Sequence, residues 1–260
     1  MQSSLSKKPQ PEPENKYPDC LYLKLEGIPV ERERLDSLEF WQTSTQTQQI
    51  DLHLTLHFNE QWESLSQGRV KFGLKGGELR VKLENSEIPY ESRELAGSFE
   101  LLLQKERQEP EGTKNQKGRE VGAHATNSSL DDRKPKEQAN FATGQRLGKI
   151  EEHQVTVCHV TTKVSEENPA WVFEEEMGGP VLKGLLDKAK LATLHAIALP
   201  CRVEATFEVS KRDVCLTDVE GLWPADISHN KRAVLARLIV QRLLEPKFQP
   251  YLSRAELQYD

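Results

Sequence analysis

IDLHLTLHF, at residues 50–58, has an apolar side chain at every second position and a polar one at each position between. Successive side chains of a β-strand point to opposite faces of a sheet. The alternation therefore predicts a strand with one buried and one solvated face. Because this is the clearest periodic pattern in the chain, it indicates a fold built mainly from β-sheets.

A second alternating pattern surrounds two glycines in VKFGLKGGELRVKL, residues 70–83. The glycines at 76–77 permit the positive φ angles that a tight turn needs. With a two-residue turn, Phe72 lies opposite Val81 and every other apolar residue also meets an apolar one. The pattern therefore predicts a hairpin with the glycine pair at its tip.

Further short apolar runs extend the β pattern along the chain. The predicted strands lie at 21–26, 98–104, 153–164, 170–173, 203–209 and 213–219. Polar residues at 210–213 can turn one of these strands back into the next. The segment 181–190 fits either a strand or a helix opening at Pro180, and the short apolar runs around it favour the strand.

One amphipathic helix is predicted near the C-terminus, in NKRAVLARLIVQRLL at 230–244. Ser228 is its expected N-cap, because a serine side chain can accept a hydrogen bond from the first helical N–H groups. Pro246 is expected to end it, since proline lacks the donor and disfavours helix at Glu245 before it. The predicted buried stripe consists of Val234, Leu235, Leu238, Ile239 and Leu243.

Composition divides the chain into four parts. Residues 1–19 are predicted to be a disordered tail, and 106–148, nearly devoid of aliphatic side chains, a flexible polar linker. Residues 20–105 are predicted to form a β domain, and 149–260 a second β domain with the C-terminal helix. The predicted fold class is mainly β, with sandwich-like antiparallel sheets and one amphipathic helix. The linker either separates two domains or is an insertion between the sheets of one sandwich.

The charge balance disfavours polyanionic partners. The 260 residues include 35 basic and 41 acidic side chains, a formal net charge of −6. Nucleic acid and anionic lipid are therefore weakly attracted to the chain as a whole. No apolar run reaches the ~18 residues of a membrane span, and the N-terminus lacks the apolar core of a signal peptide. The sequence predicts a cytoplasmic protein with no membrane partner.

The cysteines and histidines do not form a metal-binding motif. The four cysteines, at 20, 158, 201 and 215, include no close pair that could arrange two ligands. His53 and His57 are separated by about 13 Å along the predicted strand, too far for one metal ion. His153 lies near Cys158 and His159, but the latter two are adjacent and point to opposite faces. The sequence therefore predicts no metal and no cofactor.

Two sets of residues are candidate functional sites. Asp218, Glu220 and His229 gather around one predicted hairpin and the helix start. They would suit acid–base chemistry if the protein is an enzyme, although turns and helix caps use the same residue types. The tryptophans are candidates for ligand stacking, or alternatively for anchoring the core. They are Trp41, Trp62, Trp171 and Trp223.

No stretch of the chain sets out the residues of a known chemistry at the required spacing. The leading hypothesis is a non-catalytic interaction or adaptor protein that binds another protein, because β modules with polar tails and linkers suit partner binding. Two alternatives remain open: a small-ligand module, for example for a sugar, and an enzyme that uses carboxylates near 213–229. The sequence does not decide the oligomeric state.

The polar linker predicts where a protease cuts first. Brief trypsin digestion is expected to cleave within 106–148, for example at Lys117 or Arg133, because a chain without packed backbone enters a protease active site readily. Mass spectrometry of the fragments checks this. First cuts within 50–83 or 203–243 would contradict the prediction.

Overall fold

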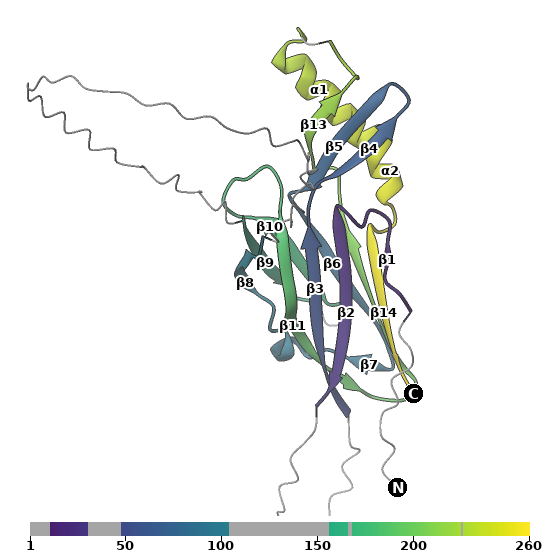
Figure 1. The fold of residues 1–260 in the computed structure, drawn as a ribbon. Coiled ribbons are helices and arrows are strands. Elements are labelled where there is room, and N and C mark those ends of the chain that lie inside the picture. The colour runs from purple at the N-terminus through teal and green to yellow at the C-terminus, as the bar shows by residue number, and fades with distance from the viewer. Residues whose placement is uncertain (1–10, 31–47, 104–155, 166–167, 225) are drawn as a thin grey trace, which may run out of the picture. The chain divides into compact units, whose positions relative to one another are not determined.

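The computed structural model describes residues 11–30, 48–103, 156–165, 168–224 and 226–260. They form three antiparallel sheets and a C-terminal helical segment (Figure 1), which confirms the predicted fold class. The large sheet has seven strands in the order β1-β14-β12-β6-β10-β9-β8. They are β1 (Glu14–Asn15), β14 (Ser253–Tyr259), β12 (Cys201–Glu208), β6 (Gly76–Glu84), β10 (Ala170–Glu175), β9 (Thr156–Lys163) and β8 (Gly97–Leu101).

Two smaller sheets complete the fold. The four-stranded sheet has the order β2-β3-β11-β7, and the three-stranded sheet has the order β13-β5-β4. The first contains β2 (Leu21–Pro29), β3 (Gln48–Phe58), β11 (Gly184–Ala196) and β7 (Ser86–Glu87). The second contains β13 (Val214–Glu220), β5 (Gly68–Leu74) and β4 (Gln61–Leu65). A 3₁₀ turn, η1 (Tyr90–Ser92), precedes β8.

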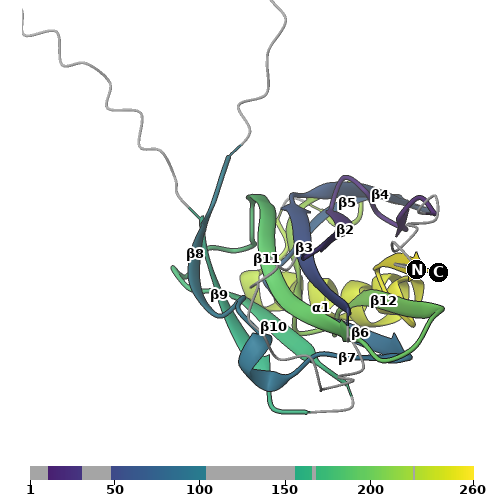
Figure 2. The same cartoon turned by 90° about the horizontal axis from the view of Figure 1, so that it is seen from below.

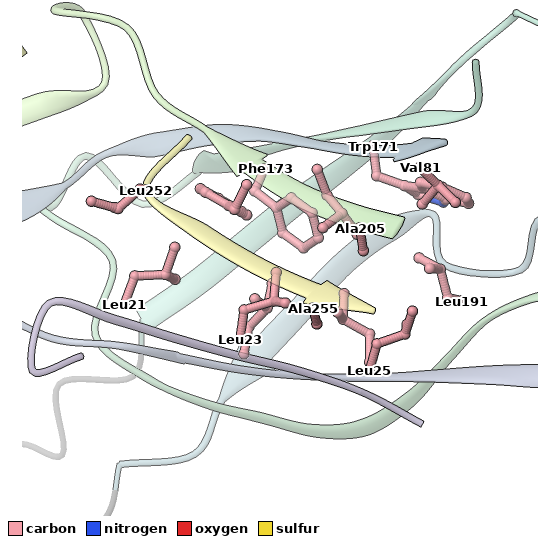
Figure 3. Close-up of a cluster of buried hydrophobic side chains, with 14 of the residues drawn as sticks. Leu21, Leu23, Leu25, Val81, Trp171, Phe173, Leu191, Ala205, Leu252 and Ala255 are labelled. Atoms are coloured by element: carbon pink, nitrogen blue, oxygen red, sulfur yellow. The ribbon is translucent and has the colours of Figure 1, made fainter. Parts of the chain in front are cut away.

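The large and four-stranded sheets enclose a common apolar core. Figure 3 shows leucines of β2 on one side of this core and residues of the large sheet on the other. At its centre, the rings of Phe58, Phe173 and Phe207 lie with centroids 5.8–6.4 Å apart. At one side, Leu102 and Leu185 exchange backbone hydrogen bonds of 3.0 and 2.8 Å. The two sheets therefore form a sandwich, joined by hydrogen bonds along that side (Figure 2).

Strands from both predicted β domains share every sheet. β6 pairs with β12 and β10, β3 pairs with β11, and β5 pairs with β13. The described residues before and after 104–155 therefore form one compact unit. The sequence left open whether the linker separates β domains at 20–105 and 149–260 or is an insertion within one sandwich, and the pairing of described strands from both parts is the arrangement expected for an insertion. The predicted linker, Trp41 and His153 lie outside the described residues.

Most predicted strands are confirmed. β3 buries its apolar positions from Ile50 to Phe58 and leaves the alternate ones half-buried, as the period-two pattern predicts. The segment 181–190 is strand from Gly184 onward, in β11. The turn at 210–213 is present, with a hydrogen bond of 3.0 Å from the Asp213 N–H to the Ser210 carbonyl. The strands that it joins, β12 and β13, belong to different sheets.

The hairpin predicted around residues 76–77 is wrong. β5 and β6 do not pair with each other. Phe72 lies opposite Leu216 of β13, and Val81 lies opposite Ala205 of β12. The chain instead passes from the three-stranded sheet directly into the large sheet. The glycine pair is the beginning of β6 rather than the tip of a turn.

Glycine is needed at this crossing for space. A Cβ added at Gly76 would lie 2.2 Å from the carbonyl oxygen of Phe173. One added at Gly77 would lie 2.3 Å from a ring carbon of Phe207. These approaches are far below van der Waals contact, so the backbone passes where no side chain fits.

The tail predicted at 1–19 is ordered in its second half. β1 pairs with β14, and the Lys16 N–H donates a 3.1 Å hydrogen bond to the Leu252 carbonyl. The Tyr17 ring packs edge-on against Phe72 and Phe248, with centroids 5.5 and 5.3 Å away. The prediction of disorder is therefore wrong for residues 11–19, because one aromatic side chain and a short strand bind this segment to the core.

Replacing Gly77 with Ala tests the packing at the crossing. The added methyl group must displace the buried Phe207 ring, so Gly77→Ala is expected to lower the free energy of unfolding by about 1–3 kcal/mol. Gly179→Ala is the matched control, because its Cβ would meet the Glu175 side chain, which can move. Urea unfolding of both variants measures the difference. Equal stability of the two would contradict this account.

Candidate functional site

The helical segment after β13 is longer than predicted. It consists of α1 (His229–Ile239), a π-helical turn η2 (Val240–Leu244) and α2 (Glu245–Phe248) in direct succession. Ser228 is the N-cap residue, as predicted, but its side chain makes no capping hydrogen bond. Pro246 does not end the helix: it lies in the first turn of α2, directly after the π-helical turn η2, a combination typical of kinked but continuous helices. The predicted end at Glu245 and Pro246 is therefore wrong.

The predicted buried stripe of this helix is also wrong. Its members are exposed except for the half-buried Ile239. The exposed fractions are 60% for Val234, 37% for Leu235, 37% for Leu238 and 43% for Leu243. No residue of α1 is buried. Most of the apolar side chains of α1 therefore contact solvent.

The helical segment is instead anchored by a different row of side chains. Val240, Leu244 and Phe248 are buried and follow one another at intervals of one helical turn. The Phe248 ring lies 5.4 Å from that of Phe72 and 5.3 Å from that of Tyr17. These contacts fix η2 and α2 against the three-stranded sheet. α1 extends beyond this anchor, beside β13 (Figure 1).

Two adjoining cavities lie between α1 and β13. The first, of about 310 Å³, is lined by strand residues 216–219 and by Trp223, His229, Arg232, Ala233 and Ala236. The second, of about 460 Å³, is lined by Lys211, Arg212, strand residues 214–216, Ala236, Arg237 and Val240. Leu216 and Ala236 line both cavities, so the two lie next to each other along the strand. We call them together the β13–α1 groove.

The strand wall of the groove is the outer strand of its sheet. β13 pairs with β5 on one side, and no strand in the described part of the chain pairs with its other side. The register with β5 shifts between Leu216 and Asp218. Next to this irregularity, the Val219 N–H donates to the Asp218 carboxylate at 2.8 Å. An outer strand of this kind leaves backbone donors and acceptors for another chain.

The Glu60 carboxylate interacts with two lysines and with Thr217 in the middle of β13. This carboxylate, 9% exposed, lies 2.7 Å from Lys183 Nζ and 3.2 Å from Lys71 Nζ. Burial alone would raise the pKa of Glu60, but hydrogen bonds from Lys183, Thr217 and Lys71 outweigh it and lower this pKa. Because Thr217 sits at the irregularity of β13, the Glu60 network supports the strand wall of the groove.

The predicted acid–base residues are partly brought together. Asp218 and His229 both line the first cavity. Among the described residues, however, no hydrogen bond or ion pair joins their side chains. Glu220 is half-exposed and makes an ion pair of 2.6 Å with Arg69. The three side chains therefore do not form the hydrogen-bonded arrangement that proton transfer needs.

The described tryptophans have three different environments. Trp171 is fully buried in β10 and belongs to the core. Trp62 is half-buried, and the Arg69 guanidinium lies 4.4 Å from its ring centroid. Trp223, also half-buried, lines the β13–α1 groove. Of the three, Trp223 is the one that a ligand in the groove would contact.

Two of the four thiols, those of Cys20 and Cys158, are poorly suited to nucleophilic chemistry. Cys20, Cys158 and Cys201 are buried, and all four cysteines, including the half-buried Cys215, are unpaired. Burial raises the pKa of Cys20 and of Cys158 to about 12, so at neutral pH these two remain protonated. Within the described ranges, no group of three or more His, Cys, Asp or Glu side chains could hold a metal ion.

Sequence reasoning missed the basic residues that line the groove. Lys211 and Arg212 belong to the predicted turn at 210–213, and Arg232 and Arg237 lie on the predicted helix at 230–244, which was interpreted from its apolar residues. One signal was present in the sequence: residues 227–244 contain no Asp or Glu, although the chain as a whole is acidic. A basic helix next to a strand is the feature that could have pointed to this site.

Comparisons of the chain with protein-family models, with curated proteins and with solved structures found no match. In the described residues, none of the helices has the length and apolar composition needed to cross a membrane. The functional argument therefore depends on the geometry of the groove.

The Glu60 network predicts an acid-sensitive strand wall. Because the folded-state pKa of Glu60 is lowered, its stabilising contribution is present above the ordinary value of about 4.3 and is lost as the pH falls through the folded-state pKa. Glu60→Gln is expected to lower the free energy of unfolding by about 1–3 kcal/mol at pH 7, and by less at pH 3.5. Urea unfolding at both pH values measures this, and a difference that grows on acidification would contradict it.

Proposed function

We propose that this chain is a protein-binding module that holds an extended segment of its partner in the β13–α1 groove. The observation that supports this most directly is the outer edge of β13 along a groove that the helix leaves open. An extended peptide can pair with such an edge through its backbone, while pockets beside the strand select its side chains.

The helix wall of the groove suits this role. Ala233 and Ala236 are the groove-lining residues with the smallest side chains, and they leave space between α1 and the strand. On its remaining surface, α1 exposes Val234, Leu235 and Leu238, which are outside the buried core of the described residues. Apolar side chains exposed together are typical of surfaces that contact another protein. These features support binding of a partner over turnover of a substrate.

A small-ligand site is the second candidate function. The first cavity combines Trp223 with Asp218, His229 and Arg232. An aromatic ring beside a few polar groups is typical of ligand pockets, although about 310 Å³ is at the small end of the range of such pockets. A compound of this size would occupy one half of the groove and would compete with a peptide.

Filling the groove tests the proposed function. Ala236 lines both cavities, so Ala236→Trp is expected to block an extended segment from lying along β13. Wild-type protein should enrich specific sequences from a displayed library of random 12-residue peptides, and Ala236→Trp should not. Gln241→Trp, at an exposed position of η2 outside the groove, is the matched control and should enrich the same peptides. Thermal melting by circular dichroism checks that both variants are folded.

Amide hydrogen exchange tests the mode of binding. An enriched peptide that pairs with the strand edge should slow exchange at residues 214–220 more than at β4, the other outer strand of the sheet. Enrichment that is unaffected by Ala236→Trp, or exchange that is unchanged in β13, would contradict binding along this strand.

A further inference from the structure

The arginines outside the groove region are paired. Arg69, Arg80, Arg202 and Arg254 each have a carboxylate oxygen within 3.0 Å. Arg93 donates to the carbonyl oxygens of Lys163 and Ser165 at 2.8 and 2.6 Å. On most of the surface, therefore, each guanidinium is matched by acceptors of the same chain.

The remaining described arginines are concentrated at one place. Arg212, Arg232, Arg237 and Arg242 make no ion pair and no side-chain hydrogen bond with any described residue. Three of them line the groove, and Lys211 lies beside them. The groove thus contains four unmatched cations, whereas Asp218 is its one acidic side chain among the described lining residues. Planar guanidinium groups bind carboxylates with two parallel hydrogen bonds, so these arginines suit a carboxylate-bearing partner.

From this arrangement we infer that the segment held in the groove is acidic, with its Asp or Glu side chains beside Arg212, Arg232 and Arg237. This inference rests on the proposed function and adds the chemistry of the partner. It follows from charge complementarity: backbone pairing with β13 is independent of sequence, and the unmatched cations supply the selection.

Other occupants fit the groove less well. A second copy of this chain would bring the same cations against each other if the two grooves met, and like charges in contact oppose association. Nucleic acid would find cations, but it would also meet the Asp218 carboxylate and an apolar lining that includes Leu216, Val219 and Val240. An extended acidic peptide uses the cations, the apolar side chains and the strand edge together.

The peptides enriched from the random library test the inference directly. Acidic residues should be over-represented among the enriched sequences. A representative peptide, labelled and titrated by fluorescence anisotropy, should bind more weakly as salt is raised, because exposed charge pairs are screened. The same peptide with each Glu changed to Gln and each Asp to Asn should bind about tenfold more weakly.

Charge reversal in the groove has a matched control on the same helical segment. Arg232→Glu combined with Arg237→Glu should weaken the acidic peptide by about tenfold or more and should shift the library toward basic sequences. Lys231→Glu combined with Arg242→Glu makes the same charge change at two exposed positions outside the groove. This control should leave the affinity within about threefold, because neither side chain lines the groove and charges exposed to solvent are screened by salt.

The outcomes separate this inference from the proposed function. Enriched peptides that are neutral or basic would overturn the acidic preference and leave peptide binding intact. An absence of enrichment would overturn both. Equal losses in the two charge-reversed variants would show that the preference does not come from the groove and would overturn the inference. Tighter binding of a 20-nucleotide oligothymidylate than of the acidic peptide to wild-type protein would also overturn the inference.

Discussion

Close packing where β5 runs into β6 constrains the rest of the structure. At Gly76 and Gly77 the backbone lies directly against Phe173 and Phe207, whose rings form the centre of the sandwich together with Phe58. A second aromatic cluster attaches the helical segment to the three-stranded sheet; it consists of Tyr17, Phe72 and Phe248. Because one continuous chain passes from the second cluster into the first, the three-stranded sheet is joined closely to the core of the sandwich.

The alternating pattern of 50–58 was sufficient to predict β3 and the class of fold, because burial of one sheet face imposes a period of two. The same pattern could not identify the partners of β5 and β6. In the predicted hairpin, Phe72 and Val81 would lie opposite each other. In the structure, Phe72 lies opposite Leu216 of β13 and Val81 lies opposite Ala205 of β12. Both arrangements pair apolar residues with apolar residues. The choice depends on the backbone of Phe173 and the ring of Phe207, which are distant in sequence and occupy the space beside the glycines.

The helix shows a different limit of periodicity. Apolar residues lie on several sides of 229–248, so the pattern does not say which side is buried. The anchor at Val240, Leu244 and Phe248 decides this, because those side chains reach the core while Ala233 and Ala236 are too short to close the gap. Of the candidate site, the proximity of Asp218 to His229 could be predicted from the turn and helix start. The β13–α1 groove could not be predicted, because it depends on how far the helix lies from the strand.

Charge on this protein acts over two ranges. The formal charge of −6 opposes an acidic partner at long range, yet at physiological salt the Debye length is about 8 Å, so distant charges are largely screened. On the large sheet, Arg202 and Arg254 are neutralised by Glu204 and Glu256. Within the groove the side chains of Lys211, Arg212, Arg232 and Arg237 have no such partners in the described chain, and they would lie beside a segment bound there. Under the proposed function, this local field, rather than the net charge of the chain, would select the peptide that binds there.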